Sequence, residues 1–530
     1  MTIRGYTSYA FQGFGKGLNL LDKPDTVSIE ECIDAMNVVF NDRGAIESRN
    51  GYGKLTTSAL TNRVDSLEPF YTAAGTRQIL AGCGTRLEAI STAGAVVASA
   101  TGLTGGPYDF ARFGSPNEEV AFAANGQDTL RKWTGTEWKT PTATVDGEAT
   151  KAMPKAKFLC VQSPDNRLVA AGYGTTSGGP NGTTSSPSTV YFSEDGKPES
   201  WMTAGTAEHP NNSVQLTPGD GEKITGCISW KEFTFVFKET KFFVFGGNSV
   251  DGEGNPIFNY RTVDNGIGCV APRTICADLN GVYFMSREGV YRTTGQSPEL
   301  ISRQIEPIWK GDASPFYTGG VIAQGAITEC AATMHEEQLY LSFPTSGAND
   351  RTLIFDPRAE WWTQTSLPAS ALTSFRVGSQ AELVFGLASG TNDLGQFGPA
   401  FTTDDGAAIG ERWRSGWFDL DSPDVKTLVR SKIWGTGKVF VGLNHDFFKE
   451  VPTLDPLDLS TAAGTVWGES TWGGTVWAEP QDLVAKERVR AVRGTTFSVI
   501  FQNSISGQSF SIHRIDHMLR ETRKPATVNG

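Results

Sequence analysis

Short apolar runs separated by polar turns dominate the middle of the chain. Five segments alternate apolar and polar residues on both sides of a turn rich in glycine, acidic or other polar residues. They span residues 129–139, 188–201, 233–247, 281–295 and 351–364. This alternation, with this turn chemistry, is typical of β-hairpins. We therefore expect an all-β region between residues 56 and 404.

These hairpins recur at intervals close to the length of a propeller blade. With Trp138, Trp201, Phe245, Tyr291 and Trp361 as equivalent markers, the spacings are 63, 44, 46 and 70 residues. A four-stranded blade takes ~40–50 residues. Residues 56–404 therefore predict an irregular β-propeller of six to eight blades, with insertions in some of them.

The regions on either side of the propeller have different patterns. In the N-terminal segment 1–55, residues 26–40 contain a predicted short helix, because Ser28 can cap it and Glu30 and Glu31 would lie in its first turn. We expect this helix to end near Asn37 and residues 37–40 to be extended. Residues 301–311 predict a second short helix between blades. Strong alternation returns in residues 405–530 and predicts a C-terminal β-sandwich domain.

Tryptophan recurs every five residues in "TVWGESTWGGTVW", at Trp467, Trp472 and Trp477. In an extended strand this spacing places successive rings on opposite faces, which disfavours a one-sided platform unless turns intervene. Large amphipathic rings are concentrated at protein interfaces. We interpret the segment as a loop that anchors on a neighbouring subunit. An anchor within the same chain, and stacking on sugars or bases, are the alternatives.

Charge and cysteine usage exclude several classes of protein. The 530 residues carry a net charge of −12, and Lys and Arg are not concentrated except in residues 520–525. A tight grip on duplex DNA needs such a concentration, whereas an acidic surface suits solubility or DNA that slides without sticking. The seven cysteines form no CxxC pair, which argues against a zinc ribbon or a disulfide scaffold. No stretch reaches the roughly 18 apolar residues of a membrane span.

No catalytic motif emerges from the chain. There are five histidines and no HExxH, GxSxG, P-loop, or GxGxxG that opens a helix. His513 and His517 would lie ~13 Å apart in a strand, too far to share a metal ion. Residues 193–201 are similar to the Asp-box turn of sialidase propellers, but the spacing differs by one residue at both the glycine and the tryptophan. Such a turn is structural. Because no nucleophile, base or metal constellation is found either, we predict no enzymatic activity, no cofactor and no metal site.

The run from Gly13 to Leu55 resembles the opening of tailed-phage nozzle and hub proteins, where a glycine-led stretch precedes a propeller. Residues 226–247 and 265–292 are similar to the middle blades of the same family, and residues 465–477 and 493–515 to its C-terminal β-domain. The positions that match the N-terminal motif are Gly15, Gly17, Asn37, Gly44, Arg49 and Gly51.

The resemblance implies a structural role in a virion, after synthesis in the host cytoplasm. Such proteins form a ring at the tail end, commonly of six copies. The ring retains the packaged DNA, binds neighbouring tail or fibre proteins, and lets the genome pass without sequence-specific binding. A receptor-binding tail protein that recognises host surface glycan, and a glycan-degrading tail enzyme, are the alternatives.

Overall fold

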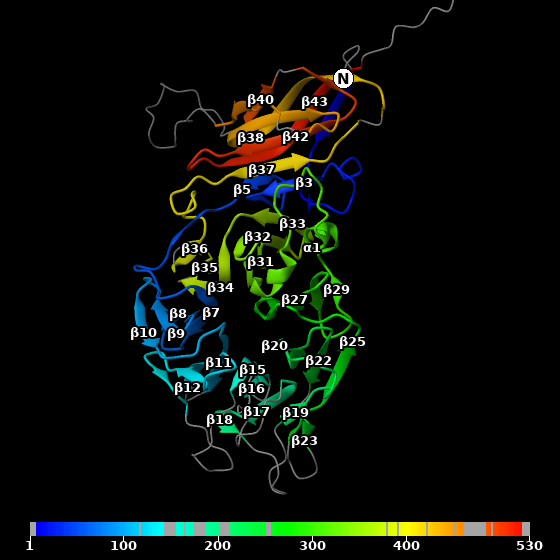
Figure 1. Ribbon diagram of the computed structural model, residues 1–530. Helices are drawn as coiled ribbons and strands as arrows, with labels where there is room; N and C mark the ends of the chain where they lie inside the picture. The colour runs from blue at the N-terminus through cyan, green and yellow to red at the C-terminus, as the bar shows by residue number, and fades with distance from the viewer. Residues whose placement is uncertain are drawn as a thin grey trace, which may run out of the picture.

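The chain is built almost entirely from β-strands in the computed structural model. Six sheets of four or five strands, and a seventh four-stranded unit that belongs to a larger sheet, form a ring of blades (Figure 1). The prediction of an all-β chain with a propeller is therefore confirmed. The structure describes residues 7–115, 118–141, 155–163, 166–173, 187–201, 213–246, 249–250, 256–377, 380–388, 392–419, 422–449, 452–460, 484–488 and 491–521.

Each blade takes its strands in chain order, and the first strand of a blade lies nearest the axis, against the first strands of its neighbours. Blade 1 is β7 (Val64–Tyr71), β8 (Arg77–Cys83), β9 (Arg86–Ser91) and β10 (Val96–Ala100); blade 2 is β11 (Asp109–Ser115), β12 (Glu118–Ala124), β13 (Arg131–Trp133) and β14 (Trp138–Lys139); blade 3 is β15 (Ala156–Gln162), β16 (Arg167–Tyr173), β17 (Thr189–Glu194) and β18 (Lys197–Trp201), with β19 (Ser213–Gln215) added. Blade 4 is β20 (Gly226–Trp230), β21 (Phe233–Phe237), β22 (Lys241–Gly246) and β25 (Tyr260–Asp264), next to a small ribbon of β23 (Ser249–Val250) and β24 (Pro256–Ile257); blade 5 is β26 (Cys276–Ala277), β27 (Val282–Ser286), β28 (Gly289–Thr293) and β29 (Glu299–Leu300). Blade 6 is β30 (Ala331–His335), β31 (Gln338–Pro344), β32 (Asn349–Asp356) and β33 (Trp361–Thr365); blade 7 is β34 (Ala369–Val377), β35 (Gln380–Leu387), β36 (Leu394–Phe397) and β6 (Tyr52–Lys54).

All five hairpins predicted from the sequence are present. They are the antiparallel pairs β13–β14, β17–β18, β21–β22, β27–β28 and β32–β33. The predicted helix in residues 301–311 is also present, as a 3-10 turn at Arg303–Ile305 followed by α1 (Pro307–Lys310). Two further 3-10 turns lie at Pro272–Thr274 and Gln324–Glu329. Local alternation was sufficient to predict the hairpins, because the two strands of each hairpin are neighbours in the sequence.

An N-terminal strand completes the ring. Blade 7 takes three strands from residues 369–397, and its outermost strand is β6, which pairs antiparallel with β36 from Lys54↔Gly395 to Tyr52↔Phe397. The blade that ends the propeller thus depends on residues that precede blade 1. This pairing holds the two ends of the ring together and gives the edge of β36 a hydrogen-bonding partner.

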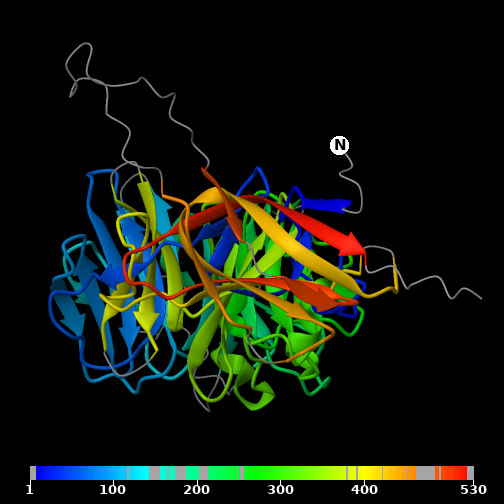
Figure 2. The same cartoon turned by 90° about the horizontal axis from the view of Figure 1, so that it is seen from above.

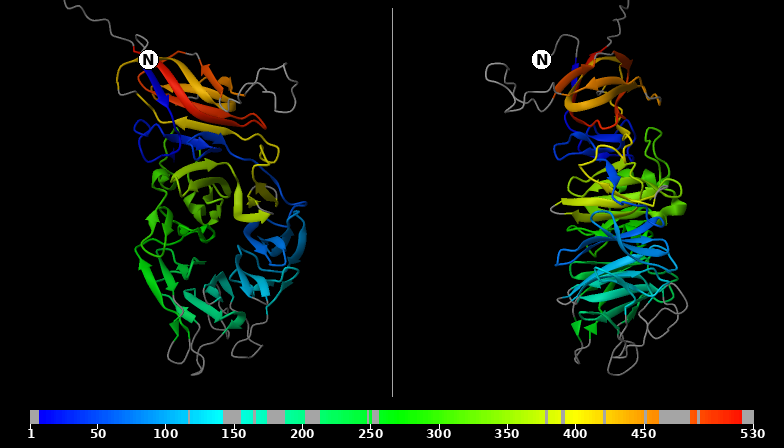
Figure 3. Two further views of the ribbon diagram at one scale, coloured as in Figure 1. Left: turned by 180° about the vertical axis from the view of Figure 1, so that it is seen from behind. Right: turned by 90° about the vertical axis from the view of Figure 1, so that its left-hand side faces the viewer.

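The C-terminal domain projects from the rim of the propeller next to blade 6 (Figure 3). Its main strand is β38 (Lys426–His445), which pairs with β43 (Phe510–Glu521) in its first half and with β42 (Phe497–Asn503) in its second half. Seen from above, β38 and β43 cross the top of the molecule together (Figure 2). Shorter strands complete the domain: β37 (Glu411–Ser415), β39 (Asp455–Asp458), β40 (Val484–Arg488) and β41 (Val492–Gly494). One strand therefore takes part in both halves of the domain.

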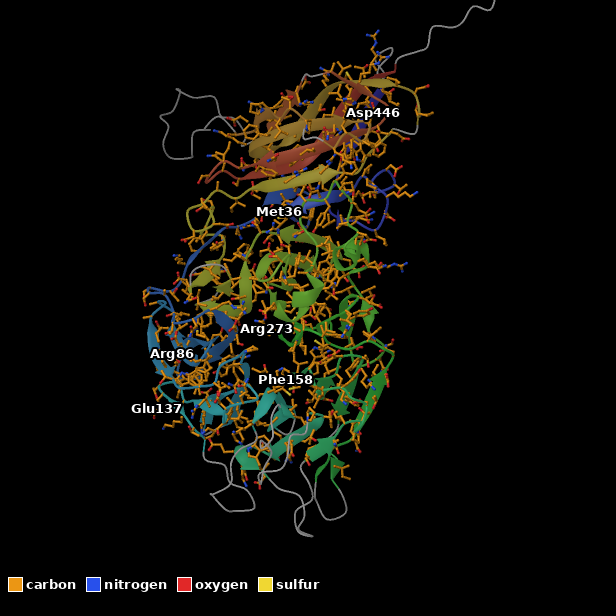
Figure 4. The ribbon with its side chains drawn as sticks, viewed as in Figure 1. Met36, Arg86, Glu137, Phe158, Arg273 and Asp446 are labelled. Atoms are coloured by element: carbon orange, nitrogen blue, oxygen red, sulfur yellow. The ribbon has the colours of Figure 1, made fainter. Side chains whose placement is uncertain are left out.

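The N-terminal segment contributes strands to this domain. β1 (Thr7–Phe11) and β5 (Ile46–Ser48) pair with β43, and β5 also pairs with β4 (Val38–Phe40). β2 (Gly17–Leu18) runs parallel to β3 (Glu31–Met36), and β3 pairs with β37. On its other side β3 meets β33 of blade 6 at Met36↔Gln364. A single sheet of 16 strands thus runs from blade 6 into the C-terminal domain (Figure 4, near Met36).

The helix predicted from residue 26 to about Asn37 is wrong, because residues 31–36 form β3, whereas the extended conformation expected after it is present as β4. The capping contacts exist: Ser28 Oγ accepts from the Glu30 N–H at 3.4 Å, and Glu31 Oε2 accepts from the Ser28 N–H at 3.2 Å. They stabilise a turn rather than a helix. The following residues are buried on both faces between β2, β33 and β37, so tertiary pairing overrides the local signal.

Candidate functional site

The residues matched by the phage-family motif meet where the chain crosses between the propeller and the C-terminal domain. The chain passes into the propeller at residues 49–52 and returns from it at residues 398–411. Arg49 lies on the first crossing and Asp404 on the second. We call the cluster of Asn37, Arg49, Ser366, Asp404 and Gly410 the junction clasp.

Arg49 forms the centre of the junction clasp. Its guanidinium binds Asp404 with two parallel hydrogen bonds, Nη2 to Oδ2 at 2.6 Å and Nη1 to Oδ1 at 2.9 Å. Its Nε donates to Asn37 Oδ1 at 2.8 Å, and Nη1 also donates to the Asn50 carbonyl at 2.7 Å. The Arg49 side chain is fully buried and that of Asp404 is 15% exposed. Paired bonds of this kind fix both distance and orientation.

Asn37 links Arg49 to the exit of blade 6. It follows β3 with φ = 58°, a left-handed conformation that asparagine tolerates better than most residues. Its Nδ2 donates to the Gly410 carbonyl at 2.7 Å and to Ser366 Oγ at 3.0 Å, while its Oδ1 accepts from the Ser366 N–H at 2.8 Å. One side chain, directly after β3, therefore binds the end of blade 6 and the loop that leads into β37.

The motif glycines lie where backbones approach closely. A Cβ on Gly51 would overlap the carbonyl oxygen of Thr403, and one on Gly17 would lie 2.6 Å from the carbonyl oxygen of Trp362. Gly44 has φ = 75°, and its carbonyl accepts from the Phe14 N–H at 2.8 Å. A Cβ added to Gly15 would lie 3.3 Å from the Gly44 Cα. Each position has a steric reason to be glycine.

Buried ionisable groups surround the junction clasp. Burial raises the pKa of Glu411 to about 7, although Asn503 Nδ2 donates to its carboxyl group at 2.8 Å. Burial also raises the pKa of Asp34 to about 6, against the opposing effect of Arg412, whose Nε lies 3.0 Å from Asp34 Oδ2. Ionisable groups with such shifted pKa values can indicate a functional site. Here, however, the contacts of Glu411 and Asp34 each connect one strand to another, which is a structural role.

The propeller axis is the second polar region. Cavities of about 460 and 400 Å³ lie along it and share Tyr108, Asp109 and Arg273 in their walls. Arg273 and Phe158 lie on opposite sides of the opening in Figure 4. Burial raises the pKa of both Glu68 and Asp109 to about 7.

These axial groups connect neighbouring blades. Glu68 of blade 1 accepts from Arg112 Nε of blade 2 at 2.8 Å, and Asp109 of blade 2 accepts from the Leu159 N–H of blade 3 at 2.8 Å. Arg273 donates to the carbonyls of Asp65 and Glu329 at 3.0 and 2.8 Å. The carboxyl groups of Glu68 and Asp109 could gain or lose a proton near neutral pH. Each of them already accepts a hydrogen bond from the next blade.

His513 and His517 both lie in β43, as expected for a strand. His517 is buried, its Nδ1 lies 2.8 Å from Ser431 Oγ, and burial lowers its pKa to about 3.

Throughout the described ranges, no cluster of three His, Cys, Asp or Glu side chains could hold a metal ion. Of the helices that the structure describes, none is long and apolar enough to cross a membrane.

Trp467, Trp472 and Trp477 lie outside the described residues.

Asn37, Arg49 and Gly51, selected by resemblance alone, do come together, and Gly44 lies at the neighbouring turn. Sequence reasoning missed their partners Ser366, Asp404 and Gly410. These are a serine, an aspartate in a "TTDDG" turn and a glycine, and only a three-dimensional pairing distinguishes them from other turn residues.

No model of a known protein family matches the chain, and no curated protein does. Solved structures that resemble it include the extracellular domain of a hybrid two-component system from B. thetaiotaomicron, with 11% identity, a TM-score of 0.41, and coverage of 79% of this chain and 57% of that one. Another is BBS1N in complex with ARL6DN, with 9% identity, a TM-score of 0.39, and coverage of 66% and 98%. The C-terminal WD40 domain of Sif2 matches with 10% identity, a TM-score of 0.33, and coverage of 69% and 97%. These likenesses concern the propeller fold and carry no argument about function.

Proposed function

We propose that the chain is a ring-forming structural protein of a bacteriophage tail, in the position of a nozzle or hub. One observation carries the proposal: the positions selected by resemblance to that family, Asn37, Arg49 and Gly51, gather at the two crossings between propeller and C-terminal domain. Such an arrangement suits a protein whose parts must keep a fixed relative position.

The continuous sheet supports the same role. Strands from the N-terminal segment lie between blade 6 and the C-terminal domain, and the buried Arg49–Asp404 pair ties the two chain crossings together. A ring at a tail end bears the pressure of a packaged genome, so a flexible linker between domains would be a weakness. The net charge of −12 suits a conduit that DNA leaves without sticking.

In this proposal the partners are further copies of the chain, commonly six in such rings, and neighbouring tail or fibre proteins. Phage DNA passes without sequence-specific contacts. The chain acts in the virion after synthesis in the host cytoplasm, and it needs no cofactor, metal ion or catalytic group.

Labelling the chain in purified virions tests the position. A gold-tagged chain should appear as a ring at the tail end in electron micrographs. A peripheral, fibre-like position would favour the receptor-binding alternative, and absence from the particle would contradict the proposal.

An activity assay tests the non-enzymatic part. Purified chain should release no sugar from host polysaccharide. Turnover that is lost in Glu68→Gln or Asp109→Asn would instead favour the glycan-degrading alternative, because these carboxyl groups line the axial cavities.

A further inference from the structure

The turn after β38 presents two phenylalanine rings at the surface. The Phe448 N–H donates to the His445 carbonyl at 3.1 Å, and both intervening residues are left-handed, Asp446 with φ = 48° and Phe447 with φ = 57°. Left-handed backbone is unusual for a bulky aromatic residue. Phe447 is 42% exposed and Phe448 is 56% exposed. We call His445, Phe447 and Phe448 the aromatic tip.

Neighbouring residues hold the aromatic tip in place. Asp446 Oδ1 accepts from the Thr495 N–H at 2.7 Å and from Thr495 Oγ1 at 2.6 Å. Phe447 packs against the buried Trp417 in a tilted arrangement with 4.8 Å between ring centroids, and Phe448 meets the His445 ring edge-on at 5.0 Å. Strained backbone persists where the surroundings enforce it, and such sites are often functional. The fold therefore keeps two apolar rings at the surface in a fixed orientation.

We propose that the aromatic tip docks the Trp-rich segment, residues 461–483, of a second copy of the chain. The inference rests on the proposed ring and names the surface through which copies join. The segment supplies Trp467, Trp472 and Trp477, and tryptophan next to phenylalanine gives both apolar burial and favourable ring contacts. Exposed aromatic residues that are rigid before binding make good anchors, because little conformational entropy is lost when they are buried.

The positions of the tip and the segment favour a contact between copies. After β39 the Leu459 N–H donates to the Gly437 carbonyl, and the chain returns in β40 at Val484 beside Gly435, both near the middle of β38. The aromatic tip follows the end of β38, ten residues beyond Gly435, which is ~33 Å along an extended strand. In the shared view of Figures 1 and 4, β40 and Asp446 lie at opposite ends of the domain. Contacts between two different patches build a ring when the rotation between successive copies closes.

The segment is also long enough to cross a subunit boundary. It has 23 residues, so each arm of about 11 residues can extend ~35 Å from its anchor. The same reach allows the segment to fold back onto the tip of its own chain. The experiment must therefore separate contacts between chains from contacts within one.

Sedimentation of the full chain over a range of concentrations measures assembly. Phe448→Ser and Trp472→Ala should each weaken association at least tenfold and leave the melting temperature unchanged. The double variant should lose little more than either single variant, because both remove the same contact. Leu279→Ser is the matched control: Leu279 is 86% exposed in the turn before β27 of blade 5, far from the tip. Association of Phe448→Ser equal to that of this control would overturn the inference.

A photo-crosslinker at position 448 identifies the occupant directly. In a mixture of ¹⁴N- and ¹⁵N-labelled chains, crosslinks should join position 448 of one isotope to a peptide within residues 461–483 of the other. Crosslinks confined to one isotope, or to a different peptide, would overturn the inference and leave the proposed function standing. If the chain sediments as a monomer, the same crosslink is made in purified particles, and absence of the chain from those particles contradicts the proposed function itself.

Discussion

Blades 4 and 5 are joined by apolar rings that lie close in the sequence, whereas the junction between the propeller and the C-terminal domain adds, to a shared apolar core, polar groups that lie far apart in the sequence. Phe237 and Phe284 pack with 4.9 Å between ring centroids across the two blades. At the junction clasp, Arg49 binds Asp404, 355 residues away. The apolar contact needs only approximate shape, while the polar contact requires a single geometry. The junction is thus the more specific of the two interfaces and the more sensitive to single changes.

The largest effect is expected from Arg49→Ala. Removing the guanidinium leaves Asp404 and the Asn37 amide oxygen without their buried partner, which costs about 3–5 kcal/mol of unfolding free energy. Denaturant unfolding measures it. The control is Arg287→Ala in blade 5, where the pair with Glu239 is mostly exposed and its loss costs below about 1 kcal/mol. Equal effects of the two changes would refute the contrast between junction and blades.

Glu411→Gln should make the stability of the junction less dependent on pH. The folded pKa of about 7 lies above the unfolded value of about 4.3, so the stabilising contribution of this carboxyl group is complete below pH ~4.3 and is lost as pH rises to ~7. The variant cannot lose a proton and keeps an acceptor for Asn503.

Its stability relative to the natural chain should therefore increase from pH 4.5 to 7, by about 2–3 kcal/mol, and stay level above pH 7. Thermal unfolding across this range measures the change. Glu299→Gln, at an exposed carboxylate in blade 5, reports the effect of removing charge at the surface. A decrease in the relative stability of Glu411→Gln with rising pH would contradict the assigned direction.

Gly51→Ala tests the close approach at the first chain crossing. The added Cβ overlaps the Thr403 carbonyl, and backbone cannot rotate away as a side chain can, so a loss of about 2 kcal/mol is expected. Gly398→Ala, at a position with open space around the Cβ, is the control on the second crossing. Retained stability in Gly51→Ala would mean that the two crossings can separate without cost.

The smallest effect is expected within a blade. Ser193→Ala removes the buried hydroxyl that accepts from the Leu168 N–H at 2.8 Å, in the turn that resembles an Asp-box, and should cost about 1 kcal/mol. Ser99→Ala in the exposed strand β10 is the control. A loss as large as that of Arg49→Ala would place the critical polar contacts in the blades as well.

The same contrast explains what the sequence could predict. Hairpins such as β27–β28 pair residues that lie close in the sequence, from Ser286↔Gly289 to Val282↔Thr293, so their alternation and turn residues are visible in one short window. β3 has no hairpin partner: it runs parallel to the two-residue strand β2, and its other partners, β33 and β37, lie more than 300 residues away. A locally favourable helix start at Ser28 was therefore misleading. Resemblance identified Asn37 and Arg49, but nothing local identifies Asp404 as the partner. The alternation in residues 405–530 likewise could not predict that β1, β3 and β5 join the C-terminal domain. These strands come from the other end of the chain, so they add nothing to the periodic pattern of that region.

The pairing of β1 with β43 sets an order of events during synthesis. Thr7 pairs with Leu519, so β1 cannot pair until the chain has been translated as far as Leu519. At about 5–20 residues per second, roughly 25–100 seconds separate the emergence of the two strands from the ribosome. During that interval β1, β3 and β5 have unpaired edges. The propeller, in contrast, can form before the C-terminal domain, since all of its strands, including β6, have already emerged. A nascent chain should therefore complete its ring first and join its two ends last. The N-terminal strands, which emerge early and pair late, are then the natural target of a chaperone.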